Sequence, residues 1–143
     1  MTWTARPHHR GGRQLALHRK RFRRERPGSW DLRWLPVCSS TEISLAEWLQ
    51  DDPDLVRPRA VLARRQRRGV GQWGRHWQSP RGGVWLSAAM PCSGQSVTAA
   101  GLLGLAFALE LAQRLERHGV PVRIKWPNDL LVEGRKLAGV LPR

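Results

Sequence analysis

The sequence predicts an α+β fold in which helices pack on a mixed or antiparallel sheet. The order of the patterned segments is the main reason: helix, strand, loop, strand, helix, and then a meander of short strands. A length of 143 residues suits one domain with one hydrophobic core. No internal repeat divides the chain into smaller units.

The first predicted helix begins at Ser39. Ser39 and Glu42 stand at the spacing of a capping box, a pattern that satisfies backbone N–H groups at the start of a helix. The segment should end near Asp51-Asp52-Pro53, because proline does not fit inside a helix. Its apolar residues can supply one buried face, formed by Ile43, Leu45, Ala46, Trp48 and Leu49.

The remaining elements follow in order along the chain. Residues 60–63 and 83–88 have the composition of short buried strands, on either side of a long loop rich in glycine and arginine. The clearest helix signal covers residues 96–118, where Ala and Leu dominate before Gly119, and we expect this helix to be mostly buried. Three strands are predicted after it, at 120–126, 130–132 and 137–141, with turns at Pro127-Asn128-Asp129 and Gly134-Arg135-Lys136.

Charge is distributed unevenly. The formal net charge is +14, and the only lysines are Lys20, Lys125 and Lys136. Residues 1–30 are strongly basic and lack a sustained period, so we expect a disordered arm there and a folded domain over 31–143. Residues 57–81 hold eight arginines and no acidic residue. A bound anion is the simplest way to stabilise such a concentration of like charge in a folded segment.

Composition also excludes several classes of protein. Cys38 and Cys92 lack metal-ligand spacing and are too few for a disulfide framework, so we expect reduced thiols, no metal site and a cytoplasmic location. The apolar run at 99–109 is shorter than the ~20 residues that a membrane-spanning helix needs. The basic N-terminal region has no long apolar stretch of the kind that a secretory signal requires.

The loop after the first predicted strand contains a G-x-G-x-x-G pattern from Gly69 to Gly74. A dinucleotide-binding turn would need a helix to open at the third glycine, and the residues up to Gly83 include Pro80 and a glycine pair that prevent one. Three interpretations stay open for the loop. It closes over an anionic ligand, it is a solvated surface loop, or it binds single-stranded nucleic acid through arginines and the indoles of Trp73 and Trp77.

Lys125 is conspicuous in a chain in which 22 of the 25 Lys and Arg residues are arginines. A lysine ammonium is a compact point charge that fits against a phosphate or a developing oxyanion. From composition alone, an ordinary cation at the end of a strand is the competing interpretation, with Asn128-Asp129 simply forming a turn.

Several motifs resemble those of the bacterial biotin protein ligases. The K-W-P-N-D sequence at 125–129 and the K-L-A-G sequence at 136–139 match two of that family's motifs. Ser40-Thr41 resembles its S-T pair, and the spacing of glutamine, glycines and arginine over residues 63–80 resembles its ligand-binding loop. The resemblance covers residues 31–141 and implies the fold shared by class II aminoacyl-tRNA synthetases and biotin ligases. It also implies a truncated, partial catalytic domain over 31–143.

The resemblance implies an ATP-dependent ligase. Biotin's carboxylate would attack the α-phosphate of ATP, aided by Mg²⁺, and give biotinyl-5′-adenylate and pyrophosphate. A lysine of the biotin carboxyl carrier protein of acetyl-CoA carboxylase would then take the biotinyl group. Lys125 would be the catalytic residue and would contact biotin. The other implied biotin-binding residues are Ser40, Thr41, Gln66, Gly69, Gly71, Arg75 and Trp77, and the implied nucleotide-binding residues are Arg75, Trp77, Asn128, Asp129 and Lys136.

The sequence departs from the family's pattern at three positions. Val70 and Gln72 replace the two interior arginines of the usual G-R-G-R loop, and Glu42 stands where an asparagine often follows the S-T pair. Two alternatives therefore stay open beside the ligase: a basic nucleic-acid-binding protein that uses the Arg/Trp loop, and a non-catalytic remnant that binds biotin. The positions of the matched residues favour a biotin site over a nucleic-acid partner.

Overall fold

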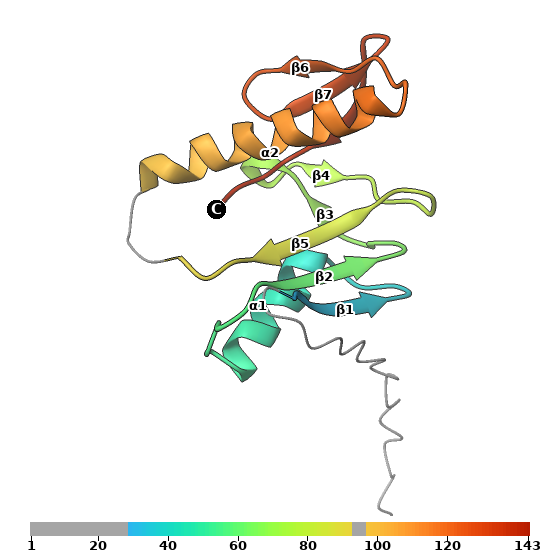
Figure 1. The fold of residues 1–143 in the computed structure, drawn as a ribbon. Coiled ribbons are helices and arrows are strands. Elements are labelled where there is room, and N and C mark those ends of the chain that lie inside the picture. Colours follow the sequence, from blue (N-terminus) through green and yellow to red (C-terminus); the bar gives the residue numbers. More distant parts are fainter. Residues whose placement is uncertain (1–28, 93–96) are drawn as a thin grey trace, which may run out of the picture.

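The computed structural model describes residues 29–92 and 97–143, so most of the predicted arm at 1–30 lies outside the described residues. Two helices and a set of short strands alternate along this part of the chain (Figure 1). Their bounds are β1 (Asp31–Leu35), α1 (Thr41–Asp51), β2 (Arg59–Ala63), β3 (Gly69–Val70), β4 (His76–Trp77), β5 (Trp85–Ala89), α2 (Val97–Arg117), β6 (Arg123–Lys125), β7 (Asp129–Val132) and β8 (Arg135–Gly139). The α+β class predicted from the sequence is confirmed.

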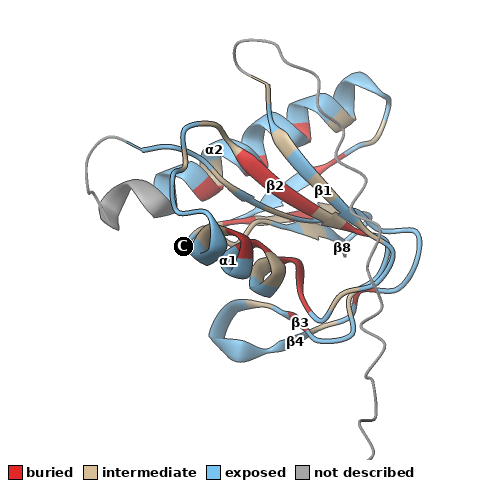
Figure 2. Cartoon of the chain, turned by 90° about the horizontal axis from the view of Figure 1, so that it is seen from below, coloured by how far each residue is buried: buried red, intermediate tan, exposed pale blue. Residues whose placement is uncertain are grey.

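The first layer is a mixed sheet with the order β1-β2-β5. β1 runs parallel to β2, and β2 runs antiparallel to β5. The sequence analysis missed β1, whose five residues alternate between half-buried and exposed positions. α1 covers one face of this sheet, and buried residues gather in β2 and on the inward side of α1 (Figure 2). The core there consists of Leu45, Trp48 and Val61.

α1 begins one residue later than predicted. Ser40, not Ser39, is the N-cap, and its Oγ accepts a hydrogen bond of 3.2 Å from the backbone N–H of Glu42. The extended backbone of Ser40 allows this contact, which satisfies one of the free donors of the first turn. The helix ends at Asp51, as the Asp51-Asp52-Pro53 sequence predicted. Ile43 remains exposed, so the buried face is narrower than expected.

The segment predicted as one long loop contains a small hairpin. β3 and β4 pair antiparallel, with Gly69 opposite Trp77 and Val70 opposite His76. A single 3-10 turn over Gln72–Gly74 joins them. Trp73 occupies the left-handed region there with a φ of 59°, and its side chain is 91% exposed at the tip of the hairpin.

The second layer consists of α2 and the antiparallel sheet β6-β7-β8. Its core contains Ala108 and Ala112 from α2, Val122 before β6, and Leu130 from β7. A two-residue turn at Glu133-Gly134, with φ values of 50° and 75°, joins β7 to β8. Both residues lie in the left-handed region, as a tight hairpin of this kind requires. The predicted strands are therefore present with shifted limits.

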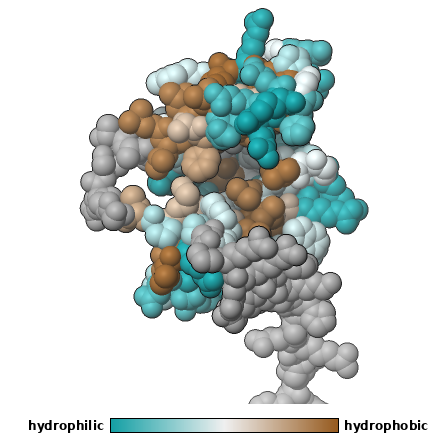
Figure 3. Space-filling view, viewed as in Figure 1, coloured by the Kyte–Doolittle hydropathy of each residue, from teal (hydrophilic) through white to brown (hydrophobic). Residues whose placement is uncertain are grey.

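α2 is much more exposed than predicted. Leu102 is 67% exposed, and Phe107 and Leu109 are each 48% exposed. The helix packs against β6 and β7 through the stripe that contains Ala108 and Ala112. Apolar surface is accordingly visible where α2 lies (Figure 3). Neither described helix is long and apolar enough to cross a membrane.

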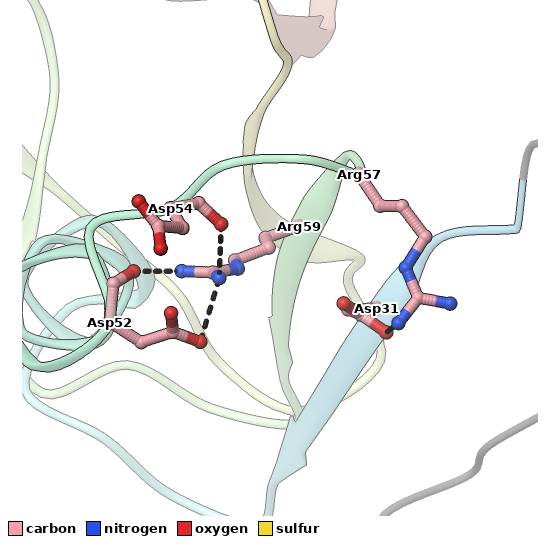
Figure 4. Close-up of polar contacts among 5 residues, drawn as sticks. All are labelled: Asp31, Asp52, Asp54, Arg57 and Arg59. Atoms are coloured by element: carbon pink, nitrogen blue, oxygen red, sulfur yellow. Dashed lines mark hydrogen bonds and ion pairs between the residues drawn. The ribbon is translucent and has the colours of Figure 1, made fainter.

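Arg59 anchors the end of α1 to β2. Its side chain is 5% exposed and forms an ion pair of 2.7 Å with Asp52, whose backbone oxygen also accepts from the guanidinium. The backbone oxygen of Asp54 accepts a further hydrogen bond of 2.9 Å (Figure 4). Since three acceptors converge on one guanidinium, the buried charge is compensated. Arg57 forms a looser and more exposed pair with Asp31.

Candidate functional site

Four side chains form a polar cluster where α1, β5 and the segment after β2 meet. The polar cluster consists of Thr41, Gln66, Ser79 and Ser87. Gln66 Oε1 accepts from the backbone N–H of Thr41 at 2.7 Å and from its hydroxyl at 3.0 Å. Gln66 Nε2 donates to Ser79 Oγ at 2.8 Å. The Thr41 and Ser87 hydroxyl oxygens are 2.8 Å apart.

The donor and the acceptor of each side-chain hydrogen bond in the polar cluster can be assigned. A hydroxyl has one proton, so Thr41 Oγ1, which donates to Gln66, must accept from Ser87. Ser79 Oγ likewise accepts from Gln66 and donates to the backbone oxygen of Trp77 at 3.3 Å. This series of hydrogen bonds fixes the orientation of the Gln66 amide and leaves one N–H of that amide without an assigned acceptor. The cluster therefore presents a neutral site with donors and acceptors in a fixed arrangement.

The backbone positions Gln66 rigidly. Gln66 forms an isolated parallel bridge with Cys38, and its N–H donates to the Ser79 oxygen at 3.2 Å. The neighbouring residues continue the pairing, since Arg67 N–H donates to Cys38 and Arg68 N–H donates to Ser39. These backbone hydrogen bonds continue the parallel pairing of β1 with β2 beyond the last residues of the two strands. The predicted site residues Ser40 and Thr41 thus lie directly beside Gln66, and both are buried.

Gly69 stands at the closest approach between the cluster and the hairpin. An ideal Cβ at Gly69 would lie 2.6 Å from the backbone oxygen of Trp77 and 2.7 Å from Ser79 Oγ. Real Cβ atoms do not approach oxygen so closely, so only glycine fits without displacing the pair. Gly71 is different, because its nearest atoms would lie at an ordinary contact distance of 3.5 Å.

Lys136 joins the hairpin to the second layer. Its Nζ forms an ion pair of 2.6 Å with Asp129 Oδ1 and lies 4.7 Å from the ring centroid of Trp77. Asp129 stands opposite Lys125 in the β6-β7 register and opposite Gly139 in the β7-β8 register. The structure therefore brings four of the predicted residues into one neighbourhood: Trp77, Lys125, Asp129 and Lys136.

Asn128 and Arg75 are not part of this set of contacts. Asn128 is buried, and its side chain donates to the backbone oxygen of Val140 at 2.5 Å, which gives it a structural contact. Arg75 and Lys125 are exposed, and neither side chain has a hydrogen bond or ion pair within the described part of the chain. Glu42, the departure beside Ser40-Thr41, forms an ion pair of 2.7 Å with Arg143.

Cys38, which bridges to Gln66 through the backbone, has a half-buried thiol. Burial raises the pKa of the Cys38 thiol, so this group stays protonated at neutral pH. Over the ranges 29–92 and 97–143 there is no group of three or more His, Cys, Asp or Glu residues that could hold a metal ion. Both cysteines are free thiols.

Two members of the polar cluster were missed in the sequence analysis as site residues. Ser79 belongs to the loop pattern, but its side chain was assigned no role. Ser87 is the one hydroxyl in the otherwise apolar β5 sequence WLSAA. A polar residue at a half-buried position of a strand needs a partner, and that signal could have identified Ser87.

The fold and the candidate site together define an α+β domain with a neutral polar cluster beside a glycine hairpin and exposed cations. The sequence model of the biotin/lipoate A/B protein ligase family matches residues 34–143. The chain therefore belongs to the biotin/lipoate A/B protein ligase family.

Relatives agree with this membership. The bifunctional ligase/repressor BirA of Escherichia coli strain K12 is 38% identical over 109 residues, which cover 75% of this chain and 33% of that protein. The biotin–[acetyl-CoA-carboxylase] ligase of Paracoccus denitrificans is 38% identical over 108 residues, which cover 73% of this chain and 45% of that protein. The chain thus spans less than half the length of these two relatives.

Solved structures show the same fold. The Aquifex aeolicus biotin protein ligase in complex with biotin and ATP superposes with a TM-score of 0.65 and 33% identity, over 77% of this chain and 45% of that one. The Helicobacter pylori biotin acetyl coenzyme A carboxylase synthetase with bound biotinylated ATP gives a TM-score of 0.63 and 27% identity, over 77% of this chain and 53% of that one.

Proposed function

We propose that residues 31–143 are part of the catalytic domain of an ATP-dependent ligase that activates biotin as biotinyl-5′-adenylate. The adenylate's biotinyl group would then pass to a lysine of the biotin carboxyl carrier protein of acetyl-CoA carboxylase, in the cytoplasm. The observation that carries the proposal is the polar cluster next to exposed cations. Two relatives that bind biotin with a nucleotide share this fold, which supports the same chemistry here.

The polar cluster suits the neutral end of biotin. A ureido group offers two N–H donors and one carbonyl acceptor, so it needs a site with both kinds of partner in fixed positions. Thr41 and Gln66 would provide them, with Ser40 holding the start of α1 and Ser87 orienting the Thr41 hydroxyl. Gly69 and Gly71 would let the hairpin backbone approach the ligand.

The exposed cations of the site suit the carboxylate of biotin and the triphosphate of ATP. A carboxylate and a triphosphate repel one another, and positive groups must offset that repulsion before the carboxylate oxygen can attack the α-phosphate. Lys125 would contact both groups and is the proposed catalytic residue. Arg75 and Trp77 would close over the adenylate, and Lys136, Asp129 and Asn128 would line the nucleotide side. In the second step the carrier's lysine amine would attack the biotinyl carbonyl, forming an amide and releasing AMP and a proton.

Magnesium would reach the site on ATP. The described residues provide no cluster of carboxylates for a protein-held ion. Mg²⁺ typically keeps its waters and bridges substrate phosphates with one or two carboxylates. Asp129 could be one such group, although it is already paired with Lys136. Added Mg²⁺ would offset charge on the triphosphate as pyrophosphate leaves.

Biotin-dependent exchange of labelled pyrophosphate into ATP measures the first step without the carrier. We expect exchange by the purified chain, and its loss in Lys125→Ala. Arg114→Ala is the matched control, because Arg114 is an exposed cation in the last turn of α2. Calorimetry with biotin alone distinguishes the non-catalytic alternative. Biotin binding without exchange would identify a biotin-binding remnant, and absence of both would contradict the proposal.

A further inference from the structure

Four exposed arginines crowd the five residues that follow β2. We call Arg64, Arg65, Arg67 and Arg68 the basic segment. The sequence has no acidic residue from Leu55 to Leu109, so local acids cannot neutralise these charges. No member of the basic segment forms an ion pair with another described residue. The basic segment therefore places four exposed cations close together in the sequence, without an ion-pair partner among the described residues.

The basic segment is held in place by its backbone. Arg64 N–H donates to Leu35 at 3.0 Å, Arg67 N–H donates to Cys38 at 3.0 Å and Arg68 N–H donates to Ser39 at 2.8 Å. Since these bonds fix the backbone, all four arginines extend from one short, ordered stretch of chain, and together they raise the local positive potential. An arginine cluster on a rigid support is preorganised for carboxylates or phosphates, which it can bind through two parallel hydrogen bonds.

The basic segment adjoins the proposed catalytic site. Gln66 of the polar cluster lies within it, and Gly69, directly after it, pairs with Trp77. Trp77 contacts Lys136, which is paired with Asp129, the partner of Lys125 in the strand register. The hairpin that starts at Gly69 also carries Trp73, whose indole is almost fully exposed. A macromolecule seated on the basic segment would therefore reach the site.

We propose that the basic segment, together with Trp73, is a docking surface for an acidic face of the carrier protein that presents the acceptor lysine. This inference rests on the proposed function, because the second step brings a protein to this site. Exposed Trp and Arg are the side chains that most often dominate protein interfaces. A nucleic-acid surface would need its cations spread along a phosphate backbone. Here they gather beside a small-molecule site.

The experiment reverses charge in the basic segment and leaves the proposed catalytic residues intact. Arg64→Glu/Arg67→Glu changes the net charge by the same amount as the control, Arg114→Glu/Arg135→Glu. The control arginines are exposed, form no ion pair with another described residue, and lie on α2 and β8. Circular dichroism of both variants confirms folding before use.

Three measurements separate the two proposals. Pyrophosphate exchange reports adenylate formation, transfer kinetics report KM for the biotin-accepting carrier, and fluorescence anisotropy reports binding of the labelled carrier without any reaction. We expect the Arg64/Arg67 variant to keep its exchange rate and to lose about tenfold in carrier affinity at low salt. The difference should shrink at high salt, where exposed charges are screened. The control variant should stay within about twofold of wild type.

The outcomes are distinct. Loss of carrier binding in the Arg64/Arg67 variant supports the inference even if no chain shows exchange, a result that would contradict only the proposed ligase activity. Normal exchange with carrier affinity and KM unchanged in the variant would overturn the inference. The inference would be overturned in favour of a nucleic-acid partner if a single-stranded oligonucleotide bound the wild-type chain more tightly than the carrier does, and if the Arg64/Arg67 variant lost that binding.

Discussion

Gly69→Ala tests whether the glycine hairpin and the polar cluster form one packed unit. The added Cβ would lie 2.6 Å from the backbone oxygen of Trp77 and 2.7 Å from Ser79 Oγ. Neither atom is the free end of a flexible side chain, because one is backbone and the other is hydrogen-bonded to Gln66. The β3-β4 pair or the polar cluster must therefore shift.

The magnitude follows from these contacts. Forcing an extra methyl group into a packed site costs about 1–3 kcal/mol. Displacing Ser79 would also weaken its bond from Gln66, and a typical hydrogen bond contributes about 1 kcal/mol. We expect Gly69→Ala to lower the free energy of unfolding by about 2–4 kcal/mol in total.

Gly71→Ala is the matched control in the same hairpin. Its Cβ would meet its nearest atoms at 3.5 Å and 3.6 Å, and its φ of −102° is open to alanine. Alanine there reduces the freedom of the unfolded chain, so we expect a change between zero and about 1 kcal/mol of stabilisation. Urea unfolding followed by circular dichroism measures both variants. Equal stability of Gly69→Ala and Gly71→Ala would refute the packing argument.

Three further predictions rest on single contacts. Arg59→Met should lower the free energy of unfolding by about 2–3 kcal/mol in urea unfolding, whereas Arg57→Met, which breaks only an exposed pair, should change it by less than about 1 kcal/mol. At pH 8, Cys38 should react with iodoacetamide more slowly than the cysteine of an unfolded peptide, because burial raises the pKa of its thiol and keeps it protonated. Its alkylation rate should increase as the pH rises, and a rate that does not change with pH would contradict this prediction. Asp129→Asn removes the carboxylate that neutralises Lys136, so inorganic pyrophosphate should bind up to about fivefold more tightly in calorimetry at low salt, and unchanged affinity would argue against it.

The main elements of the fold could be predicted because their signals are local. The N-terminal residues of α1, the apolar run of β2 and the composition of α2 each need only neighbouring residues to be recognised. β1 was missed because its sequence, DLRWL, is too short to indicate a strand alone, and it forms by parallel pairing with β2 at a distant part of the chain. The β3-β4 pair was missed for the same reason, since each strand has two residues.

The exposure of α2 could not be predicted from its composition. Ala and Leu on several faces indicate a helix buried on all sides, but burial depends on what other layers pack against it. In the described structure only the stripe around Ala108 and Ala112 is covered by β6 and β7. The position of the N-cap shows the same limit on a smaller scale. Ser39 and Ser40 are equally good caps by residue type, and the structure distinguishes them: Ser40 Oγ accepts from the N–H of Glu42, whereas the backbone oxygen of Ser39 accepts from Arg68.

The candidate site was predicted in its parts but not in its connections. Matching motifs named Thr41, Gln66 and Lys136, and the structure adds what joins them. Gln66 links α1 to the hairpin through Ser79, and Lys136 links the hairpin to the second layer through Trp77. These contacts join residues that are far apart in the sequence, and a sequence motif does not show which of its residues lie close together in space.

The site divides into two parts with different physical demands. The polar cluster is partly buried, with Thr41 and Ser79 as its buried members, and its side chains hydrogen-bond to one another, so substitutions there should reduce stability and, on the proposed function, biotin binding together. Arg75, Lys125 and the basic segment are exposed and unpaired within the described residues, so substitutions there should change binding of anions with little effect on folding. The loop positions Val70 and Gln72 are neutral, which leaves Arg75 as the one arginine of the hairpin, with the basic segment directly before it. On the proposed function, the rigid part would provide specificity for the neutral end of biotin, and the exposed part would attract anionic partners.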